Sequence, residues 1–331
     1  VKGGEAFMKN YFSFFILLIL INLAANAQHE PLFSSYMLNR HVANPGFVGS
    51  NSTVNAVFIN RTMFAGFGDG KPVSSVFGVE GPVEILGTNS GLGFTIVSDE
   101  LGFYNNIDVE AAYSFHHQLT NGTIGGGLTL NITNYSINPE WESIDGDYWI
   151  DASSDPLVPT GSDLSTITFG VGAGFYYETN DYYIGLAASN LNRSDVIFSS
   201  SNAEEWYSGF NVPHYYLTGA YNIELPNPLL DLQPSVMLRS DLSAYMLDMN
   251  GTLYIKDKYW AGFGLRSSPR NFAAFNFLGG IELFNGLKLS YMLDINTSML
   301  LVAPTSHEIL VTYSFNIEAK RNQKYKSIRY L

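Results

Sequence analysis

The segment His307–Glu318, with the sequence HEILVTYSFNIE, alternates between apolar and mostly polar residues. In a β-strand, side chains two positions apart point to the same side, so this pattern predicts one continuous apolar face. The residues of that face are Ile309, Val311, Tyr313, Phe315 and Ile317. No amphipathic helix follows the N-terminal apolar run to cover such a face. We therefore expect lipid to cover it, with this strand closing a barrel by pairing with the first strand.

The composition supports a membrane β-barrel over a soluble protein. Only 14% of the residues are charged and 15% are aromatic, whereas about 25% charged residues is typical of soluble domains. The mean hydropathy of +0.04 is too low for a bundle of membrane helices and fits strands that alternate between apolar and polar residues. The competing interpretation is a soluble β-sandwich with aromatic side chains packed across its strands.

Residues 1–27 are predicted to contain a secretory signal peptide. The apolar run Tyr11–Leu23 follows Lys9 and precedes Ala25-Asn26-Ala27, so cleavage is expected before Gln28. The run is shorter than the roughly 20 apolar residues that a membrane helix needs. Residues 1–7 are expected to lie upstream of the true start at Met8.

Three further segments follow. Residues 28–52 contain prolines and glycines without clean alternation and are predicted to form an irregular N-terminal segment in the periplasm or the barrel lumen. Residues 53–318 are predicted to form an all-β, transmembrane, antiparallel β-barrel. Residues 319–331 carry basic but no acidic side chains, whereas 137–163 is acidic. We expect these two charged segments to lie on opposite sides of the membrane, and the acidic excess argues against nucleic-acid binding.

About fourteen strands are expected. They are 53–64, 72–84, 89–98, 103–118, 123–136, 164–177, 182–192, 214–224, 231–240, 246–256, 259–267, 271–283, 287–296 and 307–318. The long links at 137–163, 193–213 and 297–306 follow odd-numbered strands. The tight links all follow even-numbered strands, and they are Leu119–Gly122, Glu178–Asp181, Asp257-Lys258 and Phe284-Asn285-Gly286. Outer-membrane barrels have short periplasmic turns and longer outer loops. This parity predicts periplasmic termini and extracellular long loops.

No catalytic site, cofactor or metal centre is predicted. His116 and His117 are neighbours on a strand and point to opposite faces, so they cannot chelate one ion together. No nucleophile is fixed beside a base, and an enzyme is not expected. Asp145-Gly146-Asp147 could bind calcium through oxygen ligands, but its spacing does not match an EF-hand loop and solvated acidic loops are common. Whether this loop binds calcium stays open.

Large aromatic residues in two predicted outer loops are the candidate partner-binding residues. They are Trp141, Trp149, Trp206 and Tyr207. Exposed aromatic side chains of this size are found where they pack on each other or on a partner, and they dominate binding energy at interfaces. Two interpretations stay open: loops folded over the barrel mouth, and a docking surface for another protein.

Several ordered motifs resemble the PorP/SprF family of Bacteroidetes outer-membrane proteins, associated with type IX secretion and gliding. Phe33–Asn39 and Asn44–Ser50 are similar to the family signature FSQYMFN…NPAYAGS, with Gly-Phe-Val in place of Ala-Tyr-Ala at 46–48. Arg61 matches a family arginine, although Thr62-Met63-Phe64 departs from the residues that usually follow. The motif positions singled out are Tyr36, Asn39, Asn44, Pro45, Gly49, Ser306, His307 and Glu308.

The resemblance implies a non-catalytic barrel that works beside the type IX translocon in the outer membrane. Its expected partners are translocon components, outer-membrane lipid and a secreted surface protein with a C-terminal targeting domain, which the barrel would help to secrete or anchor. The alternative function is a channel for small solutes or hydrophobic ligands. The residues do not name the partner, decide whether the lumen is open or plugged, or assign a role to the basic tail.

Overall fold

The computed structural model describes residues 31–85, 87–137, 164–199, 205–256, 258–268, 271–297 and 303–315. Apart from a short helix α2 (Arg40–Ala43) and a 3-10 turn η1 (Pro45–Phe47), the regular structure in these ranges is β-strand. No helix within the described ranges is long and apolar enough to cross a membrane.

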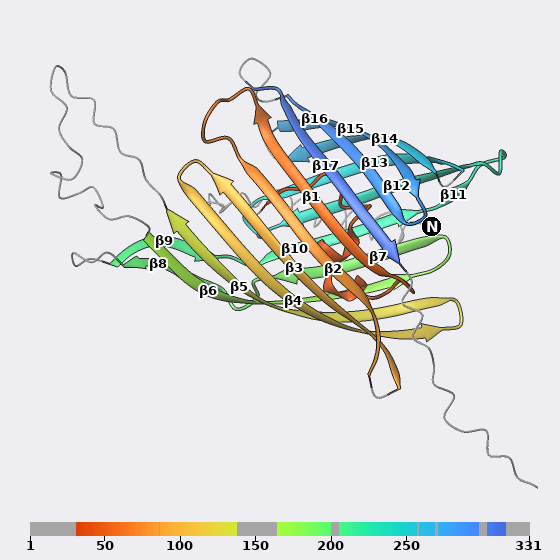
Figure 1. Ribbon diagram of the computed structural model, residues 1–331, viewed down its shortest axis with the longest axis horizontal. Helices are drawn as coiled ribbons and strands as arrows, with labels where there is room; N and C mark the ends of the chain where they lie inside the picture. Colours follow the sequence, from red (N-terminus) through yellow and green to blue (C-terminus); the bar gives the residue numbers. More distant parts are fainter. Residues whose placement is uncertain are drawn as a thin grey trace, which may run out of the picture.

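The strands form one closed antiparallel barrel (Figure 1). The hydrogen-bonded sheet has 15 strands, of which β11 (Ile223–Glu224) is a two-residue extension beside β12, so fourteen strands make the wall. They are β1 (Val54–Ala65), β2 (Val73–Ile85), β3 (Thr88–Leu101), β4 (Tyr104–Leu119), β5 (Gly122–Ile137), β6 (Leu164–Glu178), β7 (Tyr182–Ser189), β10 (His214–Tyr221), β12 (Leu230–Ser240), β13 (Tyr245–Ile255), β14 (Tyr259–Ser268), β15 (Asn271–Phe284), β16 (Leu287–Asn296) and β17 (Thr305–Phe315). The predicted fourteen-strand barrel is confirmed.

The last strand closes the barrel on the first. β1 and β17 pair antiparallel, with Val54 opposite Phe315 and Ile59 opposite Leu310. An even number of strands allows this closure with every neighbouring pair antiparallel. The sheet therefore has no free edge along its length, which removes the unpaired backbone groups that a membrane cannot satisfy.

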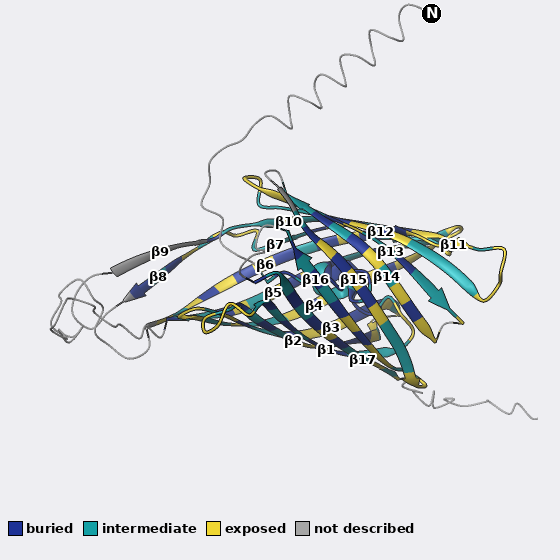
Figure 2. Cartoon of the chain, turned by 90° about the horizontal axis from the view of Figure 1, so that it is seen from above, coloured by how far each residue is buried: buried dark blue, intermediate teal, exposed yellow. Residues whose placement is uncertain are grey.

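Buried and exposed residues alternate along the barrel strands (Figure 2), as expected when successive side chains point in turn to the lumen and to the outer surface. On β5, Leu128 is 59% exposed and Leu130 is 66% exposed, whereas Thr129 between them is buried. On β17, Ile309 and Tyr313 face outward, whereas Glu308 and Leu310 are buried inside. An apolar surface of this extent in water would be a strong association site. Hydrocarbon is the environment that fits it.

One predicted link is not a simple loop. Residues 193–213 were expected to connect two barrel strands without strands of their own, but they contain the hairpin β8 (Ser194–Ser199) and β9 (Glu205–Asn211) outside the barrel sheet. Val196 and Phe198 of β8 are buried against Ile137 at the end of β5. The apolar alternation in this hairpin covers only two positions, which is too short to identify a strand from its period.

Several strand ends also differ from the prediction. β3 continues to Leu101, three residues beyond its predicted end, and β4 begins at Tyr104, so the two strands are joined by the tight turn Gly102-Phe103, in which Gly102 adopts a φ of 58°. This tight turn follows an odd-numbered strand, so short links occur at both ends of the barrel. β7 ends at Ser189 and β10 at Tyr221, three residues earlier than expected in each case. The expected positions 316–318 of the last strand lie outside the described residues.

Residues 31–52 lie inside the barrel and are called the plug below. Tyr36 and Met37 are buried against Met237, Trp260, Leu278 and Met292 of the wall. Phe47 is buried against Tyr176 and Tyr183 on the other side of the lumen. The predicted signal peptide, residues 28–30 and the basic tail 319–331 lie outside the described residues.

Wall glycines make room for the plug. A Cβ added to Gly127 would lie 2.3 Å from the carbonyl oxygen of Pro45, and one added to Gly174 would lie 2.1 Å from the Asn44 side chain. Gly49 of the plug has a φ of 67°, a left-handed conformation that favours glycine, and it lies against the backbones of Gly81 and Gly91. The plug backbone thus packs on the wall backbone at distances that larger residues would prevent.

Candidate functional site

The first attachment of the plug is a carboxylate that receives two consecutive backbone N–H groups. Oε2 of Glu308 accepts from Ser34 N–H at 2.8 Å, and Oε1 accepts from Ser35 N–H at 3.0 Å. Plug residues at this point form no regular structure that would satisfy these donors, and a buried unpaired N–H is costly. Glu308 is itself fully buried, so the two bonds form in a region without bulk water.

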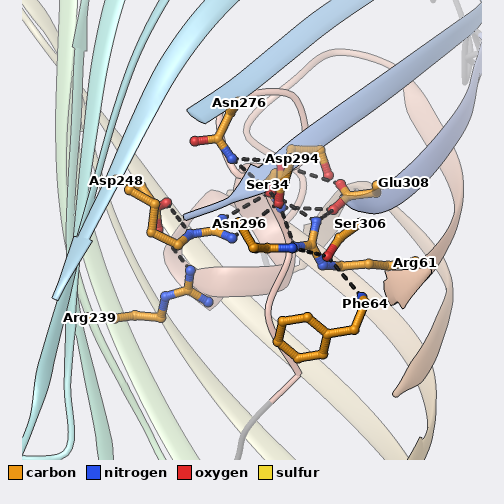
Figure 3. Close-up of polar contacts among 12 residues, drawn as sticks. Ser34, Arg61, Phe64, Arg239, Asp248, Asn276, Asp294, Asn296, Ser306 and Glu308 are labelled. Atoms are coloured by element: carbon orange, nitrogen blue, oxygen red, sulfur yellow. Dashed lines mark hydrogen bonds and ion pairs between the residues drawn. The ribbon is translucent and has the colours of Figure 1, made fainter. Parts of the chain in front are cut away.

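Glu308 belongs to a buried charge network on the lumen wall (Figure 3). Arg61 of β1 donates from Nη1 to Glu308 at 2.9 Å and from Nη2 to Asp294 of β16 at 2.6 Å. All three side chains have no exposed surface. Because one guanidinium is shared by two carboxylates, Arg61 alone does not balance the charge.

Two further arginines balance the charge of the carboxylates. Arg266 of β14 donates to Asp294 at 3.2 Å and, through Nε, to Asp248 of β13 at 2.6 Å. Arg239 of β12 also donates to Asp248, at 2.8 Å. With Arg61 and Glu308, the network contains three guanidinium groups and three carboxylates. Buried ionic groups persist when they are paired and hydrogen-bonded in this way.

The Ser34 hydroxyl links the plug to the centre of the network (Figure 3). Its Oγ donates to Asp294 at 2.7 Å and accepts from Arg61 and Arg266, each at 2.9 Å. Asn276 of β15 donates to Asp294 at 2.6 Å. A single plug hydroxyl therefore satisfies donors and acceptors from three wall strands, which fixes the position of the plug rather than merely filling space.

The second attachment lies on β6 and β7. The Asn44 amide donates to the carbonyl oxygens of Phe175 at 3.0 Å and Leu186 at 3.3 Å, and its Oδ1 accepts from Gly46 N–H at 2.8 Å. Asn44 thus caps the start of the 3-10 turn of the plug and anchors it to the backbones of β6 and β7. Pro45, the next residue, is buried at the start of that turn.

An arginine–aromatic group supports the same region. The Arg40 guanidinium lies over the rings of Phe47 and Tyr183, at 4.7 and 4.8 Å from their centroids, and donates to Glu178 at 2.5 Å. Phe47 stacks on Tyr176 with ring centroids 4.2 Å apart. Such cation–π and stacking contacts add to the apolar burial of the ring.

The third attachment holds the end of the plug on β2 and β4. Glu80 of β2 accepts from Gly49 N–H and from the Asn55 amide. The carbonyl oxygen of Val48 contacts Nε2 of His116 at 2.8 Å and accepts from the Ser114 hydroxyl. Plug residues 34–49 are thus fixed at three places around the lumen.

His41 of the plug has a pKa well below its ordinary value. His41 approaches the β2 backbone near Gly78, and its Nε2 has no hydrogen-bond partner within the described ranges. Burial, together with the charge of the adjacent Arg40, lowers the pKa of His41 to about 4. Burial also raises the pKa of Tyr36 well above its ordinary value, with Ser235 opposing that shift through a hydrogen bond. His41 is therefore neutral at neutral pH.

The structure brings together most of the motif residues singled out in the sequence. Glu308 meets Ser34 and Ser35, while Ser306 lies beside it, accepting from Asn296 at 3.0 Å. Tyr36, Asn39, Asn44, Pro45 and Gly49 are all buried in the plug. His307 is the exception. It points away from the lumen, with its Nδ1 2.6 Å from the hydroxyl of Tyr291.

Of the four candidate partner-binding residues, Trp206 and Tyr207 lie within the described residues. Trp141 and Trp149 lie outside the described residues, as does the acidic sequence Asp145–Asp147. The backbones of Trp206 and Tyr207 lie in β9, opposite Phe198 and Ile197 of β8. Within the described ranges no group of three or more histidine and acidic side chains could hold a metal ion.

Sequence reasoning missed most of the charged network. Four of its members were not identified as site residues, namely Arg239, Asp248, Arg266 and Asp294, and neither was Glu80 of the third attachment. All five occupy lumen-facing positions of strands in a chain that has few charged residues. Ionisable side chains at inward positions of membrane strands are a signal that could have found them.

Cavities lie on both sides of the plug. One, of about 380 Å³, is lined by Asn39 and Pro45 together with β3, β4 and β5. Another, of about 330 Å³, is lined by Asn39 and Arg40 together with β1, β16 and β17. Asn39 borders both cavities. The plug therefore stands between two cavities within the lumen.

A closed fourteen-strand barrel with an apolar outer surface and a lumen filled by its own N-terminal segment defines a membrane protein with the fold of outer-membrane β-barrels. Residues 25–313 match the family described as type IX secretion system membrane protein PorP/SprF. The chain belongs to the PorP/SprF family, as the motifs had indicated. No curated protein sequence matches it.

Solved barrels show partial structural similarity. The outer membrane protein Omp33 of Acinetobacter baumannii is 4% identical, with a TM-score of 0.48 over 82% of this chain and 100% of that chain. The CymD monoaromatic hydrocarbon channel is 8% identical, with a TM-score of 0.48 over 87% and 94%. A mutant of Rh. blastica porin is 11% identical, with a TM-score of 0.36 over 80% and 99%.

Proposed function

We propose that this protein works in the outer membrane as a non-catalytic component of the type IX secretion machinery, where it helps to secrete or anchor a surface protein. The partners would be translocon components and a secreted protein with a C-terminal targeting domain. Both termini would face the periplasm, and the long acidic loops would face outward. Membership of the PorP/SprF family supports the secretion context.

The observation that carries the proposal is the fixed plug. Residues 34–49 are held at three places on the wall, and one of these is a buried network in which three guanidinium groups form ion pairs with three carboxylates. A diffusion channel needs an unobstructed lumen, whereas a docking barrel needs a rigid body that presents loops and strand ends. The plugged barrel suits the second requirement.

Affinity recovery from cells tests the proposal. The full-length tagged protein is purified after mild cross-linking, and a second tagged outer-membrane barrel from the same cells is the control. We expect translocon components and a surface protein with a C-terminal targeting domain to be recovered with this protein and not with the control barrel. Equal recovery with both barrels would contradict the proposed role.

The second candidate is a channel for small solutes or hydrophobic ligands, favoured by the cavities on the two sides of the plug. Planar bilayers distinguish the two functions. A channel should conduct as purified, without any secretion partner. The docking function predicts little conductance from the purified barrel, because the plug occupies the lumen.

A further inference from the structure

The outward face of the barrel carries a polar patch at the place where the first and last strands meet. The four strands concerned, β2, β1, β17 and β16, are consecutive in the sheet (Figure 1). Their polar outward residues are Ser75 on β2, Asn60 and Thr62 on β1, His307 on β17 and Tyr291 on β16. The residues on both sides of each in the sequence are buried, so these five side chains point away from the lumen. We call them the seam patch.

Strand register makes the seam patch continuous. Asn60 lies opposite Ser75, and its amide donates to the Ser75 hydroxyl at 2.9 Å. Thr62 lies opposite His307 across the pair of strands that closes the barrel. Nδ1 of His307 lies 2.6 Å from the Tyr291 hydroxyl. The patch therefore forms one polar area on the outer surface.

Apolar residues border the seam patch on both sides along its two outer strands. Residues two positions away on the same strand share its outward face. These flanking residues are Val73 and Phe77 on β2, and Leu289 and Leu293 on β16. The patch thus lies within the apolar belt of the barrel, and not at the edge of that belt.

The opposite wall shows what contact with lipid alone requires. The outward residues of β7 are Tyr182, Ile184, Leu186 and Ala188, and Leu186 is 58% exposed. Polar side chains at such positions are costly, because hydrocarbon offers them no hydrogen-bond partner. Contact with lipid tails therefore does not explain the seam patch.

The seam patch has hydrogen-bonding capacity beyond its internal bonds. Within the described residues the Asn60 side chain makes one bond, to Ser75, although an amide has two N–H donors and an acceptor oxygen. Tyr291 is 45% exposed and the other four residues are partly exposed, so a neighbouring molecule can reach them. That neighbour has to lie in the membrane itself and to offer polar groups at the same depth.

We propose that the seam patch is the contact surface between two copies of this chain in the membrane, related by a two-fold axis along the membrane normal. Such an axis keeps every residue at its own depth, so the patch of one copy meets the same patch of the other. Amide, hydroxyl and neutral imidazole groups each donate and accept hydrogen bonds, which makes the patch complementary to itself. The proposal does not depend on the secretion role.

Thiol cross-linking in native outer membranes tests the contact, because the chain has no cysteine. Thr62→Cys places a thiol at the centre of the seam patch, and the matched control Leu186→Cys places one on β7 in the opposite wall. With a short bismaleimide, we expect Thr62→Cys to give a covalent dimer of twice the chain mass and Leu186→Cys to stay monomeric. Absence of a dimer from Thr62→Cys, or equal yields from both variants, would overturn the proposal.

A second set of variants tests whether the polar groups cause the association. Asn60→Leu with His307→Leu, added to Thr62→Cys, removes two hydrogen-bonding groups from each copy and should lower the dimer yield about tenfold. Leu186→Ala in the same background should leave the yield unchanged. Equal yields in all three backgrounds would contradict a role for the seam patch. The heat-dependent shift on gels verifies folding, and Asn60→Leu alone replaces the double variant if that one does not fold.

Photo-cross-linking identifies the neighbour directly. A benzoylphenylalanine in place of Thr62 is irradiated in native membranes, and the adduct is analysed by mass spectrometry. An adduct with a second copy of this chain supports the proposal. Adducts only with lipid or with a different membrane protein would overturn it.

Discussion

Glu308 accepts the backbone N–H of Ser34 at 2.8 Å, although the two residues are 274 positions apart in the chain. Ser34 lies near the start of the plug, and Glu308 lies on β17, the strand that closes the barrel. The Ser34–Glu308 bond forms only when the plug is inserted, and the ion pair between Arg61 of β1 and Glu308 forms only when β1 meets β17 to close the barrel. We infer that the charge network couples the two events.

Replacing Glu308 with Gln should destabilise the folded barrel. Gln keeps one acceptor for Ser34 and Ser35 but leaves Arg61 without one of its two carboxylates, and breaking a buried ion pair from one side costs about 3–5 kcal/mol. Urea unfolding in detergent measures the loss. The control Glu84→Gln removes an exposed carboxylate near the end of β2 and should leave the unfolding midpoint within error. Equal midpoints for both variants would contradict a structural role for the network.

Gly127→Ala should disturb the plug because the added Cβ would lie 2.3 Å from the carbonyl oxygen of Pro45. Overpacking of this kind costs about 1–3 kcal/mol. Gly251→Ala is the matched control, since its Cβ would meet nothing within 4 Å. Unfolding in urea and proteolysis of the plug should both be accelerated in the first variant alone. Identical behaviour of the two variants would show that the plug does not pack on β5.

Stability should depend on pH through His41. Its folded pKa of about 4 lies below the unfolded value of about 6.5. The unfolded chain therefore binds more protons between these values, and the stabilising contribution present above pH 6.5 is lost as the pH falls towards 4. We expect the wild type to lose more unfolding free energy than His41→Gln across this window. Parallel pH profiles of the two proteins would show that His41 is not buried as described.

The double variant Trp141→Ala with Trp206→Ala should weaken recovery of the surface partner if the predicted outer loops form a docking surface. Large aromatic residues supply much of the binding energy at protein interfaces, and each truncation there costs about 2 kcal/mol or more. Affinity recovery with tagged protein measures the effect, with the barrel content of the membrane as the control. Unchanged recovery would favour loops that only cover the barrel mouth.

The barrel was predictable from sequence because its cause is local. Alternation such as that of His307–Glu318 depends only on the period of two and on lipid covering one face, so strand number and closure follow without knowledge of partners. The β8–β9 hairpin escaped prediction because its buried residues, Val196 and Phe198, are too few to establish a period.

The candidate site was harder to predict from the sequence because its contacts join residues that are far apart in the chain. Motif comparison singled out Asn44 and Glu308, but not which groups they would meet. Nothing in the local sequence of Asp248 or Asp294 shows that each shares arginines from other strands. Strand register fixes these neighbours, and register emerges only when the whole sheet has closed.

The most direct test of a barrel filled by its own N-terminal segment is thiol labelling, because the chain has no cysteine. Val48→Cys places a thiol in the plug at a residue that is 2% exposed, and Leu242→Cys places one in a turn at a residue that is 76% exposed. In the folded barrel a bulky maleimide should label Leu242→Cys rapidly and Val48→Cys only after unfolding in urea. Equally rapid labelling of both thiols before unfolding would contradict the plugged barrel.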